Sequence, residues 1–255
     1  MMNLFDTHAH LTDEAYNEDR EAALREAAEE MALVINVGCD VPSSLEVLEL
    51  AQKYTNFYAA VGIHPEEALK FNQESLRKIA ELAKSPKNVA IGEVGLDYHW
   101  DVPKNIQQEA FEAQIALARE LKLPLIIHDR EAHRDTLDML ASCGAAEVGG
   151  VMHAYSGSAE MVREVLDLKF YVAFGGVLTF KNAKKSVEAA EAVPLERLLI
   201  ETDCPYMTPV PFRGKRNHPK YVRFVAEKLA EIKGMRTEEI AEITYQNGKK
   251  LFNID

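Results

Sequence analysis

Histidine and acidic residues follow several short apolar stretches of this sequence. Imidazole and carboxylate groups bind divalent ions, and both transfer protons in enzymes. His8 and His10 are the first example, because residues two apart on an extended chain project to one side and could bind the same ion. The whole set consists of His8, His10, His64, Glu93, His128, His153, Glu201 and Asp203. Burying these groups without a cation would be costly, so the set predicts a metal centre.

Six of these residues are candidate metal ligands: His8, His10, Glu93, His128, His153 and Asp203. One catalytic zinc usually has about three protein ligands, so this number favours two ions. Glu93 is the candidate bridge, because the two oxygens of a carboxylate can bind two ions about 3.5–4 Å apart. The ligand types suit zinc or manganese, and the oxygen ligands also admit magnesium. His133 does not complete an H-E-x-x-H motif with His128 and is expected at the surface or behind the ligands.

The stretch IETDCP (200–205) places two acids two positions apart. If the preceding strand continues to Asp203, the carboxylates of Glu201 and Asp203 point to one face. We predict that Asp203 binds metal and serves as the catalytic base, together with Glu93 as a catalytic residue. Glu201, one pleat deeper, is expected to orient a ligand or a basic side chain. Cys204 is expected to pack in the core.

Eight apolar runs predict the strands that position these residues. Most are continuously apolar, as expected for parallel strands that are buried on both faces. The runs are 4–8, 33–38, 57–63, 89–94, 124–129, 150–155, 170–176 and 198–203.

Helical patterns lie between and after these runs. The clearest covers 105–122, and two more, around 219–233 and 237–252, close the chain. Another opens with Ser43 and has Glu46 three residues later, which is the spacing of a capping box.

Eight strand-then-helix units in 255 residues predict an α/β fold of the (β/α)8 TIM-barrel type. We expect one domain over 1–255, although two small domains would also fit this length. A doubly wound open sheet is disfavoured, because its first strand usually leads into a glycine-rich loop, and DTHAHL (6–11) contains no glycine. In a barrel the carboxyl ends of the strands meet at one mouth, which would gather the candidate ligands.

Composition limits the partners. The formal net charge of −12 argues against tight binding of a polyanion by the surface as a whole. No apolar run approaches the roughly 20 residues that span a bilayer, so no membrane association is expected. The three cysteines, Cys39, Cys143 and Cys204, form no C-x-x-C pair, and the first residues do not resemble a signal peptide, which together predict a cytoplasmic protein. Nothing in the sequence indicates an obligate protein partner.

Over nearly its whole length the chain resembles the TatD family of metal-dependent hydrolases. The motifs that carry this resemblance are DTHAHL (6–11), GIHPEEA (62–68), IGEVGLDYHWD (91–101), PLIIHDREA (124–132), MHAYSGS (152–158), LLIETDCPYMTP (199–209) and FRGKRNHP (212–219). The resemblance implies a TIM barrel of the metal-dependent hydrolase type that hydrolyses phosphodiester bonds with two divalent ions (Mg, Mn or Zn). It further implies that His8, His10, Glu93 and Asp203 hold one ion, and that Glu93, His128 and His153 hold the other.

The implied substrate is nucleic acid, most simply single-stranded DNA or DNA ends cleaved by a 3'-5' exonuclease. The stretch FRGKRNHPKYVR (212–223) supplies cations after the eighth run, and late barrel loops often bind phosphate. The candidate substrate-binding residues are His64, Arg130, Arg213 and Lys215. Trp100 could stack on a base or pack in the core.

Two other functions remain open. The same metal-activated water could hydrolyse a carboxyl ester or amide, including an aminoacyl ester of tRNA. A metal-containing binding module without turnover would be expected to lack a ligand or the base, and here every one is present.

Overall fold

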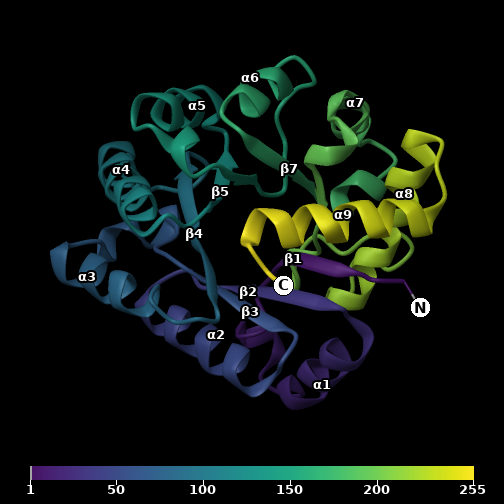
Figure 1. The fold of residues 1–255 in the computed structure, drawn as a ribbon, viewed down its shortest axis with the longest axis horizontal. Helices are drawn as coiled ribbons and strands as arrows, with labels where there is room; N and C mark the ends of the chain where they lie inside the picture. The colour runs from purple at the N-terminus through teal and green to yellow at the C-terminus, as the bar shows by residue number, and fades with distance from the viewer. Residues whose placement is uncertain (1) are drawn as a thin grey trace.

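The strands run parallel and each pairs with the next in the chain, so that the sheet curls into a nearly closed barrel with helices around it (Figure 1). The computed structural model describes residues 2–255. The strands are β1 (Phe5–Ala9), β2 (Leu33–Val37), β3 (Phe57–Val61), β4 (Asn88–Asp97), β5 (Leu125–Arg130), β6 (Gly150–Met152), β7 (Phe170–Phe174) and β8 (Leu198–Ile200). The predicted TIM barrel is therefore confirmed.

The helices alternate with the strands. The α-helices are α1 (Arg20–Glu30), α2 (Val41–Lys53), α3 (Gln73–Leu82), α4 (Lys104–Leu121), α5 (His133–Ser142), α6 (Val162–Asp167), α7 (Lys184–Ala192), α8 (Val222–Lys233) and α9 (Thr237–Phe252). Short 3-10 helices are η1 (Glu14–Tyr16), η2 (Pro65–Lys70), η3 (Ala145–Glu147), η4 (Gly176–Thr179), η5 (Leu195–Arg197) and η6 (Pro219–Tyr221).

The first strand and the segment after the last one close the barrel. Ala9 forms an isolated parallel bridge with Cys204. The amide of Asp203 donates to the carbonyl of His8 at 2.9 Å, and the amide of His10 donates to the carbonyl of Cys204 at 2.8 Å. These bonds bring the ends of β1 and β8 together, although their ligand residues are almost 200 positions apart in sequence.

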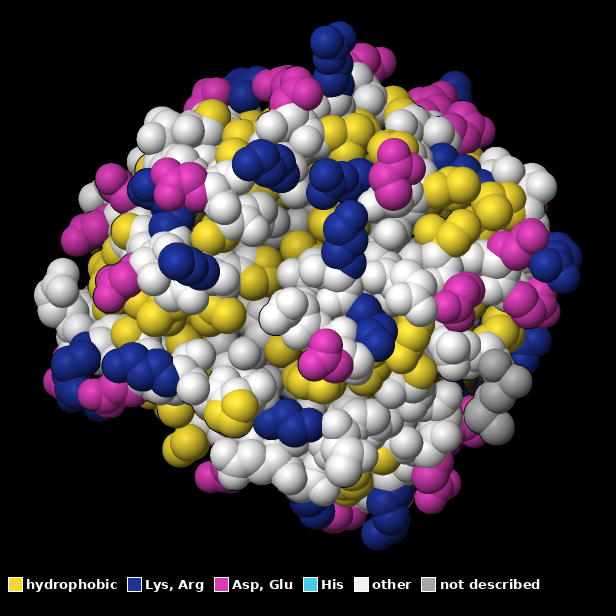
Figure 2. Space-filling model, viewed as in Figure 1, with side chains coloured by type: hydrophobic (Ala, Val, Ile, Leu, Met, Phe, Trp, Pro, Cys, Tyr) yellow, Lys and Arg dark blue, Asp and Glu magenta, His cyan; other side chains and the backbone are white. Residues whose placement is uncertain are grey.

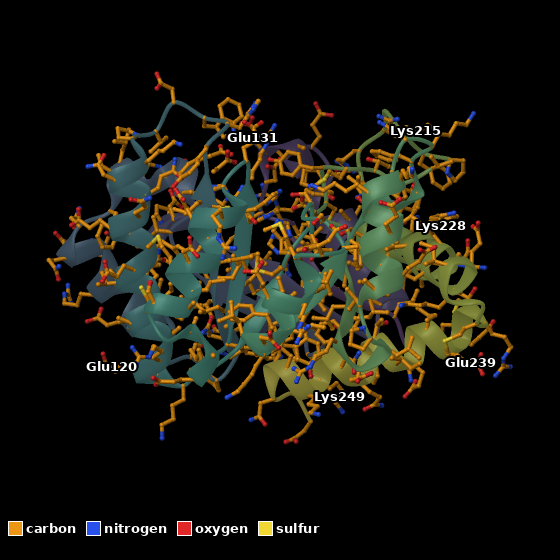
Figure 3. The ribbon with its side chains drawn as sticks, turned by 90° about the horizontal axis from the view of Figure 1, so that it is seen from above. Glu120, Glu131, Lys215, Lys228, Glu239 and Lys249 are labelled. Carbon is orange, nitrogen blue, oxygen red and sulfur yellow. The ribbon has the colours of Figure 1, made fainter. Side chains whose placement is uncertain are left out.

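Apolar side chains fill the barrel below the mouth. All eight strands contribute to one buried cluster that includes Phe5, Ile35, Ala60, Ala90, Ile126, Val151, Tyr171 and Leu199. Phe252 and Ile254, at the end of α9 and just after it, belong to the same cluster, and the rings of Phe5 and Phe252 lie 6.2 Å apart. Helix α9 thus covers the end of the barrel opposite the strand ends (Figures 1 and 3).

Two local predictions are wrong. Helix α2 begins at Val41, and its N-cap is Asp40, whose side chain accepts from the Ser43 amide at 3.0 Å while the Ser43 hydroxyl accepts from the Asp40 amide at 2.9 Å. Ser43 is therefore the third residue of the helix and closes the capping box with Asp40, and Glu46 has no part in it. Strand β8 ends at Ile200, and Asp203 adopts a left-handed backbone with φ +54°. Glu201 and Asp203 are therefore not two residues of one strand with side chains on the same face.

None of the helices between residues 2 and 255 is both long and apolar enough to cross a membrane. The face crossed by α9 carries interspersed basic and acidic side chains, and no histidine of the described residues is visible on it (Figure 2).

Candidate metal centre

The histidines and acids predicted from the sequence meet in a cavity at the carboxyl ends of the strands. The cavity has a volume of about 890 Å³. Its lining includes His10, His64, Glu93, His128, His153, Glu201 and Asp203. Figure 3 places Glu131, which follows β5, at this end of the molecule and Lys249 of α9 at the other.

The two carboxylate oxygens of Glu93 face different histidines. Oε2 lies 3.1 Å from His8 Nε2 and 3.5 Å from His10 Nε2. Oε1 lies 2.7 Å from His128 Nδ1 and 3.2 Å from His153 Nε2. Glu93 thus stands between two pairs of imidazoles, as a bridging carboxylate must.

Asp203 faces only the first pair. Its Oδ1 atom lies 3.8 Å from His8 Nε2 and 3.4 Å from His10 Nε2. Burial would raise the pKa of Asp203, but a hydrogen bond from His10 and the nearby imidazoles outweigh it, so the pKa is lowered and the carboxylate is ionised. Asp203 can therefore bind a cation or accept a proton.

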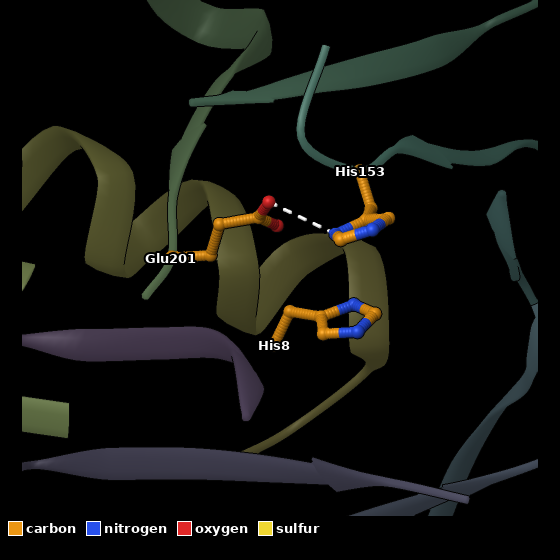
Figure 4. A group of neighbouring side chains, drawn as sticks. All are labelled: His8, His153 and Glu201. Atoms are coloured by element: carbon orange, nitrogen blue, oxygen red, sulfur yellow. Dashed lines mark hydrogen bonds and ion pairs between the residues drawn. The ribbon is translucent and has the colours of Figure 1, made fainter. Parts of the chain in front are cut away.

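Acceptors behind the imidazoles fix their orientation. Glu201 Oε1 lies 3.0 Å from His153 Nδ1, on the side of the ring away from Glu93, and also accepts from the Ala154 amide at 2.6 Å (Figure 4). The ring of His8 stacks on that of His153 with centroids 3.8 Å apart. The expectation that Glu201 orients a ligand thus has a direct contact, which is made with His153.

Two further acceptors act in the same way. Asp97 Oδ2 lies 2.9 Å from His128 Nε2, and the carbonyl oxygen of Val37 lies 3.0 Å from His10 Nδ1. Because a neutral imidazole has one N–H and one lone pair, each of these contacts leaves the inner nitrogen free to bind a metal ion.

The donor set fits a pair of divalent ions. The Nε2 atoms of His8 and His10 lie 3.0 Å apart, and Glu93 Oε2 lies beside both. These three atoms converge and can each supply a lone pair to a cation. Together they match the ligands of one metal ion. On its other side Glu93 meets two more imidazoles, so the buried clusters are consistent with a binuclear metal site.

Sequence reasoning missed two residues at the site. Burial would raise the pKa of Asp97, but hydrogen bonds from His128 and from the His99 amide outweigh it and lower the pKa. Cys39 also lines the cavity, with Sγ 3.8 Å from His10 Nδ1, and burial raises the pKa of its thiol.

The candidate substrate-binding residues divide into two groups. His64 and Arg130 line the cavity. Arg213 and Lys215 are exposed and do not line it, although Lys215 lies at the mouth end of the molecule (Figure 3). The guanidinium of Arg213 lies 4.0 Å above the ring of Phe180.

The other cations of the loop are held by acids. Arg216 pairs with Asp19 at 2.7 Å and Lys220 pairs with Glu26 at 2.6 Å. These pairs link the loop to helix α1, because Asp19 is its N-cap and Glu26 lies within it, and they leave Arg216 and Lys220 less available to a substrate.

Trp100 lines the cavity and is 50% exposed, which disfavours a role in core packing. His133 is half-buried, and its Nδ1 lies 2.7 Å from Asp129 Oδ2.

The model of the family described as TatD related DNase matches residues 5–253. This chain belongs to the TatD family. The resemblance drawn from the motifs is thereby confirmed, and the chain is a metal-dependent hydrolase of this family.

Similar proteins cover the whole chain. YabD of Bacillus subtilis (strain 168), described as an uncharacterized metal-dependent hydrolase, is 52% identical over 99% of this chain and 100% of its own length. YcfH of Escherichia coli (strain K12), described in the same words, is 40% identical over 100% of this chain and 97% of its own. The crystal structure of YjjV, a TatD homolog from Escherichia coli K12, has a TM-score of 0.92 and 32% identity and covers 99% of this chain and 98% of that one.

Proposed function

We propose that this TatD-family protein is a phosphodiesterase that uses two divalent ions (Mg, Mn or Zn) to remove nucleotides from DNA as a 3'-5' exonuclease. The observation that carries the proposal is the division of the Glu93 oxygens between His8 and His10 on one side and His128 and His153 on the other. Such a carboxylate suits paired ions, and paired-ion sites typically hydrolyse phosphate esters.

Two bound ions would supply a water of lowered pKa and positive charge beside the phosphoryl oxygens. Asp203 would take the proton of that water, because it is ionised and faces the His8 and His10 side of the site. Asp97 and Glu201 would hold the rings of His128 and His153 with their lone pairs inward.

A DNA end would enter from the cavity mouth. Arg130 would contact a phosphate, and the exposed ring of Trp100 would stack on a base. Arg213 and Lys215 would contact only a strand long enough to reach beyond the cavity. The family description as TatD related DNase supports DNA as the substrate.

A second candidate, hydrolysis of an aminoacyl ester of tRNA, has one observation in its favour. Arg130 is the only Lys or Arg in the described cavity lining, whereas the lining acids beside those of the metal centre include Asp13, Asp40, Glu46, Glu66 and Glu67. Lys70 pairs with Asp40 and Glu67, so Asp13, Glu46 and Glu66 are the acids that would attract the ammonium group of an aminoacyl substrate.

The test begins with metal analysis of the purified protein. Removal of the ions by a chelator should abolish release of nucleotides from single-stranded DNA, and adding back Mn²⁺, Mg²⁺ or Zn²⁺ separately should restore it. Undiminished DNA cleavage in chelator would refute the metal mechanism. Faster turnover of an aminoacyl ester than of DNA would instead favour the second candidate.

Variants then test the base. Asp203→Asn should abolish turnover with every metal, whereas Asp101→Asn, an exposed aspartate after β4, should have no effect. Full activity of Asp203→Asn would exclude Asp203 as both ligand and base.

A further inference from the structure

In three of the candidate ligand histidines, a hydrogen bond behind the site determines which ring nitrogen can bind metal. His10 Nδ1 donates to a carbonyl, His128 Nε2 to Asp97 and His153 Nδ1 to Glu201. When neutral, each of these rings therefore has its proton on the outer nitrogen and a free lone pair on the inner nitrogen.

His64 has the opposite arrangement. The backbone N–H of Glu66 donates to His64 Nδ1 at 3.2 Å. An amide can only donate, so Nδ1 supplies its lone pair and the proton of the neutral ring lies on Nε2. That nitrogen is the one that faces the site, 3.5 Å from Glu93 Oε1.

The local fold imposes this arrangement. His64 is the N-cap of η2, where the first amides of a helix have no partner within the helix. The His64 amide donates to the carbonyl of Cys39 at 2.8 Å, and Gln114 of α4 bonds both the amide and the carbonyl of Ile63. The backbone is thereby held, and the His64 side chain is only 10% exposed, so the ring has little room to turn over.

The proton on Nε2 has no good acceptor within the described residues. The distance of 3.5 Å between His64 Nε2 and Glu93 Oε1 is longer than the donor–acceptor distance of an ordinary N–H···O hydrogen bond. The ring meets that of His128 edge to face at 4.4 Å, and His64 lines the cavity. A buried donor of this kind should gain its partner from the substrate.

We propose that His64, although as near to Glu93 as the metal ligands are, binds no metal and instead donates a hydrogen bond from Nε2 to a non-bridging oxygen of the substrate phosphate. Proximity alone would group His64 with Glu93 and His128 as a ligand, but the tautomer excludes it. The donor acts on the side of Glu93 that faces His128 and His153, where negative charge would build during hydrolysis. This role rests on the proposed phosphodiesterase function.

The first experiment measures the tautomer and does not require turnover. Protein labelled with ¹⁵N-histidine is loaded with Zn²⁺, which is diamagnetic, and the His64 signals are assigned by their loss in His64→Gln. His64 should carry its proton on Nε2 both with and without Zn²⁺. A proton on Nδ1 in the loaded protein would show that Nε2 binds the ion and would overturn the proposal.

The second experiment counts metal and measures binding of inorganic phosphate. His64→Ala should keep as many ions per chain as the unchanged protein, whereas His153→Ala should lose metal. Phosphate should bind the loaded His64→Ala protein about tenfold more weakly or worse, as expected for loss of a donor to a charged group. Loss of an ion from His64→Ala, or unchanged phosphate affinity, would contradict the proposal.

The third experiment uses activity. Loss of one such donor typically lowers kcat about 10²–10³-fold. The Gln amide nitrogen can replace His Nε2 as a neutral donor, so His64→Gln should recover at least about tenfold of what His64→Ala loses. Equal losses in the two variants would overturn the donor role. If the unchanged protein cleaves no phosphodiester, the proposed function fails, while the tautomer, metal count and phosphate affinity still decide the role of His64.

Discussion

Asp97 and Glu201 each accept a hydrogen bond from the outer nitrogen of a histidine whose other nitrogen faces Glu93. Asp97 ends β4 and Glu201 directly follows β8, and they act on different rings, yet the effect is the same. A carboxylate behind an imidazole fixes its orientation and makes the inner nitrogen more basic. The ligands of the site therefore depend on residues that would touch neither ion.

Asp97→Asn should weaken metal binding without displacing His128. The amide oxygen of Asn can still accept from Nε2 but no longer carries charge, so we expect a loss of about 10–100-fold in affinity for Mn²⁺. A Mn²⁺ titration measures this, with Asp101→Asn as the control for charge removed from the segment that follows β4. Equal Mn²⁺ affinity in the two variants would show that Asp97 does not support the ligand.

Proton competition gives the site a pH dependence. In the metal-free protein, burial disfavours the charged ring of His128, but hydrogen bonds with Asp97 and Glu93 outweigh burial and raise the pKa from 6.5 to about 9. Below that pH a metal ion must displace a proton, so Mn²⁺ affinity should rise with pH by about tenfold per unit for each proton released.

The increase should begin to lessen near pH 9, where about half of the His128 rings have lost their proton. Asp97→Asn removes the negative charge beside His128. The rise in Mn²⁺ affinity should therefore level off at a lower pH. Titrations of Mn²⁺ between pH 6 and 9 test both statements, and an affinity that does not change with pH would contradict them.

The ends of the strands explain which site residues the sequence could predict. The sequence could indicate that the candidate ligands meet, because each lies near the end of an apolar run and parallel strands gather their carboxyl ends at one mouth. Asp97 was missed because the run was ended at Val94, whereas β4 continues to Asp97. In a strand of that length Glu93 and Asp97 share a face, so a longer strand would have revealed Asp97.

Local hydrogen bonding was harder to predict. Ser43 and Glu46 have the spacing of a capping box, but Asp40 and Ser43 have it as well, and the sequence does not rank the two. Just after β8, likewise, the Thr202 amide donates to a side-chain oxygen of Asp6 at 2.8 Å. Such contacts between distant residues cannot be read from a periodic pattern.

The cap of α2 can be tested directly. Ser43→Ala removes the hydroxyl that accepts from the Asp40 amide, and should cost about 1 kcal/mol of unfolding free energy. For a chain of this size that corresponds to a fall in Tm of about 2–4 °C. Glu46→Ala is the matched comparison and should leave Tm unchanged. The reverse result would restore the capping box predicted from sequence.

At the scale of the whole molecule, the net charge of −12 limits contact with DNA to a few places. Arg130 lies in the cavity, while Arg213 and Lys215 lie outside it at exposed positions. A short substrate would meet only the first, and a long strand could meet all three.

Arg213→Ala should therefore act in a way that depends on substrate length. The KM of a dinucleotide should be unchanged, and the KM of a longer single strand should rise. The slope of log affinity against log salt for the long strand should also fall by about 0.7, the contribution of one phosphate contact in single strands. Arg130→Ala, in contrast, should raise KM at both lengths. If Arg213→Ala raised the KM of the dinucleotide, the loop would have to reach into the cavity.

Metal binding should also stabilise the whole fold, because the ligands come from five strands or the segments directly after them. β1 supplies His8 with His10 just beyond it, β4 and β5 supply Glu93 and His128, and His153 and Asp203 follow β6 and β8. The unfolded chain cannot hold these groups together, so ions at about 100 times Kd should add about 2.7 kcal/mol of stability. That corresponds to a rise in Tm of about 5–10 °C when Mn²⁺ is added to chelated protein. The rise in Tm should be smaller in Asp203→Asn and undiminished in Asp101→Asn. A Tm that does not change when Mn²⁺ is added would mean that the barrel mouth does not bind the ion.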